Sequence, residues 1–172
     1  GIGNGNFNTG PHYTLDRKNT FFSVATYDGW ILESLSGSGL GGTLDSVSTT
    51  LRIGDDSSNR QYRSIVSFNT QGLPNNAVIT KVTLRIHQVD IRGTDPFLAL
   101  GPLLADIRMN YFGSSINLQK NDFQAAASSL AAGSFVSDAL PLWYQMDLMP
   151  GAFTFVNLTG TTQFRLRYTT PS

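Results

Sequence analysis

The sequence predicts an all-β fold, an antiparallel β-sandwich of the jelly-roll type, and three observations carry this prediction. Short runs of β-branched and aromatic residues recur along the 172 residues, with turn residues between them. Residues 81–87 show the period of two that a half-buried strand requires, because Val82, Leu84 and Ile86 alternate with polar side chains. Charged residues make up only 14% of the chain, so helices with charged outer faces are not expected.

Nine strands are expected in chain order, near residues 21–26, 30–34, 49–53, 62–69, 78–90, 103–111, 143–148, 152–157 and 162–169. Asp28-Gly29 predicts a tight hairpin between the first two, and residues 36–42 are rich enough in Ser and Gly for a loop. One short helix is expected near Asp122–Ala127, because Asn121 is a suitable N-cap and consecutive alanines favour helix.

The chain is expected to hold one domain, residues 20–172, preceded by a Gly/Asn-rich arm over residues 1–19. Phe7, Tyr13 and Leu15 are the sizeable apolar side chains of this arm. We expect these three side chains to dock the arm on its own domain or on a neighbouring molecule. A terminus rich in Gly and Asn is otherwise poorly ordered.

Composition excludes several classes of function. Twelve basic and twelve acidic residues cancel, so no net field attracts nucleic acid or anionic lipid. The absence of cysteine excludes disulfides, thiolate metal sites and thiol catalysis. No apolar run is long enough for a membrane-spanning segment. The surface is therefore expected to be low in charge and rich in Ser, Thr, Asn and Gln, which is typical of secreted β-rich proteins.

Catalytic signatures are also missing from the sequence. No serine lies in a Gly-x-Ser-x-Gly elbow of hydrolase context. Asp55 and Asp56 are adjacent, so on a strand or turn their side chains would point apart rather than face a common substrate. We therefore expect a protein that is not an enzyme and has no catalytic residues.

Aromatic side chains are the first candidates for a binding site. Trp30, Trp143 and Tyr144 could form a platform on which sugar rings stack, although large aromatics in a sandwich more often belong to the core. Trp143 and Tyr144 are neighbours, so on a strand they would point to opposite faces and one of them could be exposed.

Two weaker motifs complete the candidates. Asp55, Asp56 and Asn59 could supply oxygen ligands to calcium, with an Asx turn as the competing interpretation. No other cofactor is expected. Asn157-Leu-Thr159 is a glycosylation sequon that a secreted protein could use.

Many short segments in order resemble the DNRLRE-domain family, which is named after an Asp-Asn-Arg-Leu-Arg-Glu motif and occurs on secreted and cell-surface proteins of prokaryotes. The matching segments include residues 27–33, 51–56, 59–64, 67–70, 106–108, 122–125 and 160–167, and the resemblance covers roughly residues 21–169. It implies a β-sandwich that resembles carbohydrate-binding modules, with a role in display, adhesion or polysaccharide binding and generally without catalysis.

In similar sequences the Arg-Leu-Arg strand is followed by further strands that close the sandwich, whereas this sequence ends at Ser172. The resemblance thus implies a trimmed domain or a closing strand from elsewhere, with Phe164, Leu166 and Tyr168 on an open-edge strand. Our leading hypothesis is an extracellular structural subunit that forms a homopolymeric filament by donor-strand complementation. The alternative is a carbohydrate-binding or adhesion module of a larger cell-surface protein, with polysaccharide as its partner.

Overall fold

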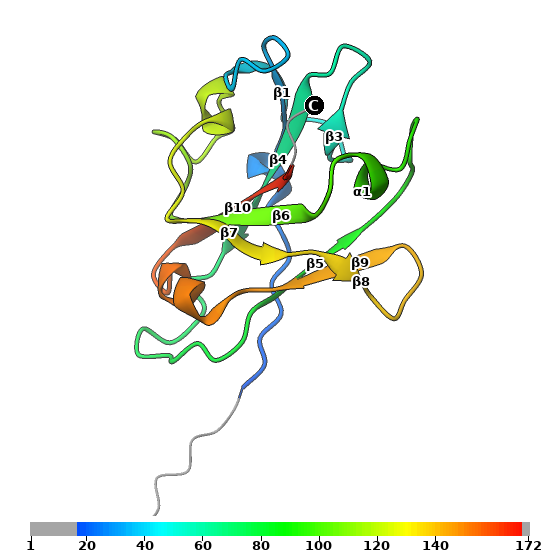
Figure 1. Ribbon diagram of the computed structural model, residues 1–172. Coiled ribbons are helices and arrows are strands. Elements are labelled where there is room, and N and C mark those ends of the chain that lie inside the picture. The colour runs from blue at the N-terminus through cyan, green and yellow to red at the C-terminus, as the bar shows by residue number, and fades with distance from the viewer. Residues whose placement is uncertain (1–16, 170–172) are drawn as a thin grey trace, which may run out of the picture.

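A computed structural model describes residues 17–169 and confirms the all-β class (Figure 1). Two antiparallel sheets pack against each other, and helical segments are short. The jelly-roll topology stays a prediction.

The larger sheet has seven strands, most of them in the order β2-β1-β4-β10-β6-β7. They are β2 (Gly41–Asp45), β1 (Gly29–Glu33), β4 (Gln61–Asn69), β10 (Thr161–Tyr168), β6 (Leu103–Met109) and β7 (Ser129–Ser134), with β3 (Gly54–Asp55) paired beside β4. The smaller sheet has the order β5-β9-β8 and consists of β5 (Thr83–His87), β9 (Trp143–Asp147) and β8 (Val136–Ser137). The chain passes from the larger sheet to the smaller one between β4 and β5, and again where β7 leads into β8 (Figure 1).

The strand β10 is central, and the prediction of an open edge along it is wrong. Thr162 to Tyr168 pair with β6, and Thr161 to Leu166 pair with β4 on the other side. Phe164, Leu166 and Tyr168 are all buried in the core. The family pattern could not reveal this, because pairing on both sides comes from strands about 60 and 100 residues earlier in the chain.

The main core lies between the two sheets. Its buried members are Val66, Leu84, Leu100, Leu103, Ala105, Ile107, Ala132, Phe135, Met146, Leu148, Ala152, Val156, Phe164, Leu166 and Tyr168. The predicted alternation of residues 81–87 is confirmed here, since Leu84 is buried in this core and Ile86 packs against it. Burial of this apolar surface is the main force that holds the sheets together.

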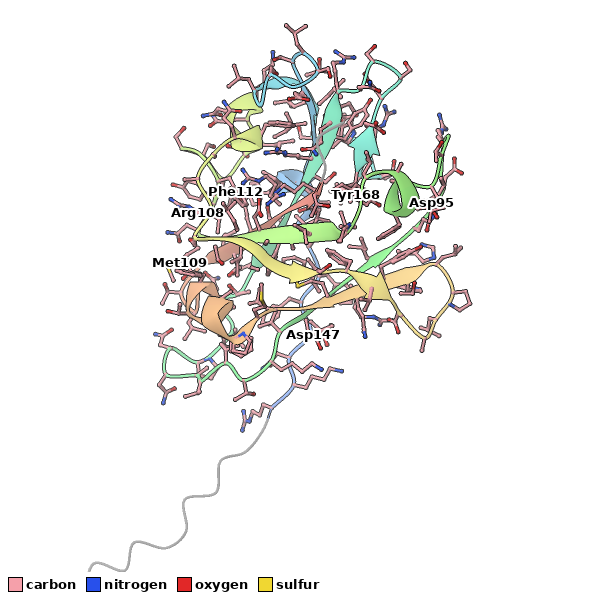
Figure 2. The ribbon with its side chains drawn as sticks, viewed as in Figure 1. Asp95, Arg108, Met109, Phe112, Asp147 and Tyr168 are labelled. Atoms are coloured by element: carbon pink, nitrogen blue, oxygen red, sulfur yellow. The ribbon has the colours of Figure 1, made fainter. Side chains whose placement is uncertain are left out.

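The outer face of the larger sheet is covered as well. Residues 110–128, hereafter the covering segment, cross it and form a second apolar cluster in which Phe112 and Phe123 pack against Ile31 and Ile65 of the sheet. Phe112 is among the residues labelled in Figure 2. The outward side chains of β4, β6 and β10 are therefore enclosed rather than solvated, although several of them are charged.

One carboxylate organises these enclosed charges. Asp106 on β6 is fully buried, and it accepts hydrogen bonds from the guanidinium groups of Arg165 and Arg167 at 2.8–3.0 Å. Arg165 also donates through Nη1 to carbonyl oxygens of Asp122, Phe123 and Ala125 in the covering segment. Asp106 thereby positions the side chain that fastens the segment to the sheet.

The same contacts explain why the predicted helix near Asp122–Ala127 is wrong. The chain forms only a 3₁₀ helix, η2 (Lys120–Phe123), which begins with a capping box between Gln119 and Asp122. Beyond it, carbonyl groups that a longer helix would use internally accept hydrogen bonds from Arg165 and Arg63 instead. The α-helix found in residues 17–169 is α1 (Pro96–Ala99), capped by the Asp95 side chain.

Other local predictions fail where tertiary contacts override them. Residues 21–26 and 49–53 are not strands, and η1 (Ala25–Tyr27) and η3 (Pro150–Phe155) occupy places predicted as extended. The prediction of a hairpin at Asp28-Gly29 is wrong, because the Asp28 carboxylate accepts a hydrogen bond from the Ser67 N–H across the fold at 2.8 Å.

Sequence analysis also missed β2, β7 and β8. A Cβ at Gly41 would lie 1.8 Å from the Lys120 carbonyl oxygen, so the glycine permits β2 to approach the covering segment.

Candidate functional site

The outer face of the smaller sheet carries Trp143, one of the aromatic residues that the sequence suggested. Trp143 and Tyr144 point to opposite faces of β9, as predicted. Tyr144 faces inward, where its ring stacks on Phe97 at 4.8 Å and its hydroxyl donates to the Gln88 side chain at 3.0 Å. Trp143 faces outward and is half-buried. Of the two neighbours, only Trp143 is therefore placed to serve as a platform.

Polar side chains surround Trp143 because of the strand register. Pairing of His87 with Trp143 and of Arg85 with Gln145 puts these four residues on one face. The His87 ring lies 5.0 Å from the Trp143 ring, and the Arg85 guanidinium lies 4.8 Å from the ring centroid. Such cation–π contact holds the indole in place. We call this surface the Trp143 face and define it as Arg85, His87, Trp143 and Gln145.

Charged groups at the border of the Trp143 face are paired. Arg85 donates through Nε to Asp138 at 2.8 Å, and this hydrogen bond lowers the pKa of Asp138. Asp147 accepts from the Thr83 hydroxyl, which is the first cause of its lowered pKa, and it lies 3.2 Å from the Lys81 ammonium. Figure 2 shows Asp147 on β9, well away from Phe112 and the covering segment. Both carboxylates are ionised at neutral pH, so the border offers donors and acceptors together.

Trp30 does not belong to any exposed platform. It is buried on β1, its ring meets Tyr62 edge-on at 5.2 Å, and the Arg52 guanidinium covers it at 4.9 Å. The prediction of Trp30 as a glycan platform is therefore corrected. Its strand is internal to the larger sheet, between β2 and β4, and sequence alternation alone could not place it there.

The loop after β3 contains an Asx turn. One oxygen of Asp56 accepts from the N–H groups of Ser58 and Arg60, and the other accepts from Nε and Nη2 of the Arg60 guanidinium. These four hydrogen bonds use the acceptor sites of one carboxylate. Asn59 takes the left-handed conformation and donates its N–H to the Asp56 carbonyl. The Asp56 hydrogen bonds thus match the competing interpretation of an Asx turn, and no group of three or more His, Cys, Asp or Glu side chains that could hold a metal occurs among the described residues. Calcium binding by Asp55, Asp56 and Asn59 stays a prediction.

The sequon residue Asn157 is buried. Its side-chain nitrogen, the atom to which a glycan would be attached, donates to the Asn110 side chain at 2.6 Å. Its side-chain oxygen accepts from the Thr159 N–H and hydroxyl at 3.0 Å. The prediction of a glycosylated Asn157 is therefore corrected, because in the folded protein this amide joins two loops.

The predicted arm residues Phe7, Tyr13 and Leu15 lie outside the described part of the chain. None of the helices over residues 17–169 is long and apolar enough to cross a membrane. No protein-family model, curated protein or solved structure matches this chain. The arrangement of side chains therefore carries the functional argument.

Sequence reasoning missed three members of the Trp143 face. The alternation of residues 81–87 did place Arg85 and His87 on the polar side of their strand. The pairing of β5 with β9, more than 50 residues later, was needed to bring them against Trp143 and Gln145. A search for polar residues next to Trp143 on the neighbouring strand could have found Arg85 and His87. Such a search needs the register between β5 and β9, which the sequence does not show.

Proposed function

We propose that the protein is a non-catalytic extracellular module that binds carbohydrate chains on its Trp143 face. The observation that carries this proposal is the half-buried Trp143 side chain in the midst of hydrogen-bonding groups on β5 and β9. A sugar ring presents C–H groups to an aromatic face and hydroxyls to side chains such as Arg85, His87 and Gln145. This combination suits a polysaccharide ligand.

The arrangement of the face supports an extended ligand. Its side chains project from two adjacent strands of one sheet. Stacking and hydrogen-bonding groups placed side by side in this way suit several sugar units in a row. The resemblance to the DNRLRE-domain family supports the same reading, together with a place on the cell surface or in a larger surface protein.

Replacing Trp143 with alanine is expected to weaken polysaccharide binding by about tenfold or more, because the stacking surface is lost. A glycan array on the whole chain would identify ligands, and isothermal titration calorimetry would measure affinity for wild type and variant. The folded state is expected to persist, since the indole is only half-buried.

Phe22→Ala is the matched control, because Phe22 is an aromatic residue that is 86% exposed and lies close in sequence to Val24, whose N–H donates to the Ser67 carbonyl of β4 in the larger sheet. Its removal is expected to leave glycan binding unchanged. Equal affinity in wild type and Trp143→Ala would contradict the proposed site, and an array without any bound polysaccharide would contradict the function.

A second candidate function is self-assembly into a surface filament, favoured by the unpaired edge of β5. Within the described residues β5 pairs only with β9. Backbone groups of Val82 and Gln88 bond toward the β9 side at 2.8–2.9 Å. Because the direction of these groups alternates along an antiparallel strand, those of Thr83, Arg85 and His87 point to the open edge. An extended segment of another copy, such as the predicted arm, could pair there.

Thr83→Pro is expected to abolish filaments seen by negative-stain electron microscopy, because proline removes an outward N–H at the first position of an edge strand while leaving the fold intact. Thr83→Ala keeps the N–H and is expected to assemble like wild type. Circular dichroism would verify the fold of both variants. Filaments from Thr83→Pro, or none from wild type, would contradict assembly through this edge.

A further inference from the structure

A pocket of about 450 Å³ lies on the outer side of the larger sheet, away from the Trp143 face. Its sheet side is formed by Arg63 of β4 and by Arg165 and Arg167 of β10, and the rest of its wall by Gln124, Ala125–Ala127 and Leu130. Three guanidinium groups thus line one side of the pocket, and mainly small apolar side chains line the other. Among the described residues, no carboxylate lines this pocket.

Strand register forces the arginines together. Leu166 pairs with Ser64, so Arg167 comes opposite Arg63 at the next position of the same antiparallel ladder. Arg165 lies two residues along β10 on the same face. Like charges directly opposite each other destabilise a sheet. The placement therefore costs stability unless negative charge offsets it.

Residues 17–169 offset only part of this charge. Within this range Asp106 binds Arg165 and Arg167, but Arg63 has no carboxylate among its hydrogen-bond partners. Glu33, on the neighbouring strand, accepts instead from the backbone N–H groups of Gly39 and Gln61. Burial, and next the charges of Arg165 and Arg167, lower the pKa of Arg63 to about 10, which leaves it positive at neutral pH.

The three arginines differ in the donors that they leave open. Arg165 uses Nε, Nη1 and Nη2 for Asp106 and the covering segment. Arg63 donates through Nε to Gln61 and through Nη1 to the Phe123 carbonyl, and Arg167 donates through Nε and Nη2 to Asp106. Within the described residues no hydrogen bond uses Arg63 Nη2 or Arg167 Nη1. Two half-buried cations therefore keep a donor for a ligand.

We propose that this pocket binds the carboxylate of a small organic acid or of an acidic sugar unit, held between Arg63 and Arg167. Guanidinium groups match planar carboxylates in charge and in geometry. The alanine side of the wall leaves room for a carbon skeleton, and the volume falls within the usual range for small-molecule sites. The site is independent of carbohydrate binding on the Trp143 face.

Isothermal titration calorimetry of the whole chain with glucuronate, the neutral glucuronamide and an oligoglucuronate tests the proposal. Glucuronamide is expected to bind about tenfold more weakly than glucuronate, because it lacks the charge. If the oligomer binds more strongly than glucuronate, the source of the carboxylate is a polymer. If the two bind equally, the source is a free acid. Equal affinity for glucuronate and its amide, or binding of none of the three, would overturn the proposal.

Variants at Ala126 test the site without removing an arginine that the fold needs. Ala126 is exposed and lines the pocket. Ala126→Glu adds a carboxylate within reach of the arginines and is expected to reduce glucuronate affinity about tenfold more than Ala126→Gln, which fills the same space without charge. Arg92→Gln, at a remote arginine whose side chain is 92% exposed, is expected to have no effect. Equal affinities of the Glu and Gln variants would overturn the site.

Discussion

Replacing Asp106 with asparagine is expected to destabilise the protein by about 3–5 kcal/mol, because it leaves buried guanidinium charge uncompensated. The Asp106 side chain is fully buried, and the Arg165 side chain is 3% exposed. Loss of the carboxylate also releases the side chain that fastens the covering segment to the sheet. Urea denaturation followed by tryptophan fluorescence would measure the change in unfolding free energy.

The contribution of Asp106 to the free energy of unfolding should decrease as the pH falls. Burial alone would raise the pKa of Asp106, but hydrogen bonds from Arg167 and the Ala131 N–H and the charge of Arg165 lower it overall. A carboxyl with a lowered pKa in the folded state contributes stability that is complete above its unfolded pKa and is lost as pH falls. The difference between wild type and Asp106→Asn should therefore be constant near neutral pH and shrink below about pH 4.

Asp90→Asn provides the control for this experiment. Asp90 pairs with Arg92 on the surface, where both side chains are largely exposed. Surface ion pairs contribute little to stability, so no measurable change is expected. A change of the same size in both variants, or a variant difference that grows as the solution becomes more acidic, would contradict the role assigned to Asp106.

Replacing Leu166 with alanine is expected to cost about 2–5 kcal/mol of unfolding free energy, because it opens a cavity in the main core. Leu166 is fully buried on β10, which is paired on both sides. The surrounding sheets cannot collapse readily into the space, since two ladders hold the strand. Chemical denaturation would measure the loss.

Leu98→Ala is the matched control, since Leu98 is 83% exposed on α1. Its replacement is expected to change stability by no more than about 0.5 kcal/mol. A small effect of Leu166→Ala, comparable to that of Leu98→Ala, would mean that β10 is a solvated edge strand and that the central position found here does not hold.

The predictable part of the candidate site was its local geometry. Opposite directions for Trp143 and Tyr144, and the polar side of residues 81–87, follow from the period of two that every strand shares. Trp30 shows the limit of this reasoning. All five residues of its strand are buried, because both faces of the larger sheet are covered, so a residue on either side is enclosed.

Long-range pairing decided the remaining features. The sequence alone predicted an all-β chain and the apolar side of residues 81–87, because backbone geometry and apolar periodicity are local properties. Only the tertiary structure decided that β10 is central, that β5 has the open edge, and that arginines of two strands share one pocket. Strand order depends on contacts between residues far apart in the chain, whose free energy comes from burial and ion pairing that no short segment contains.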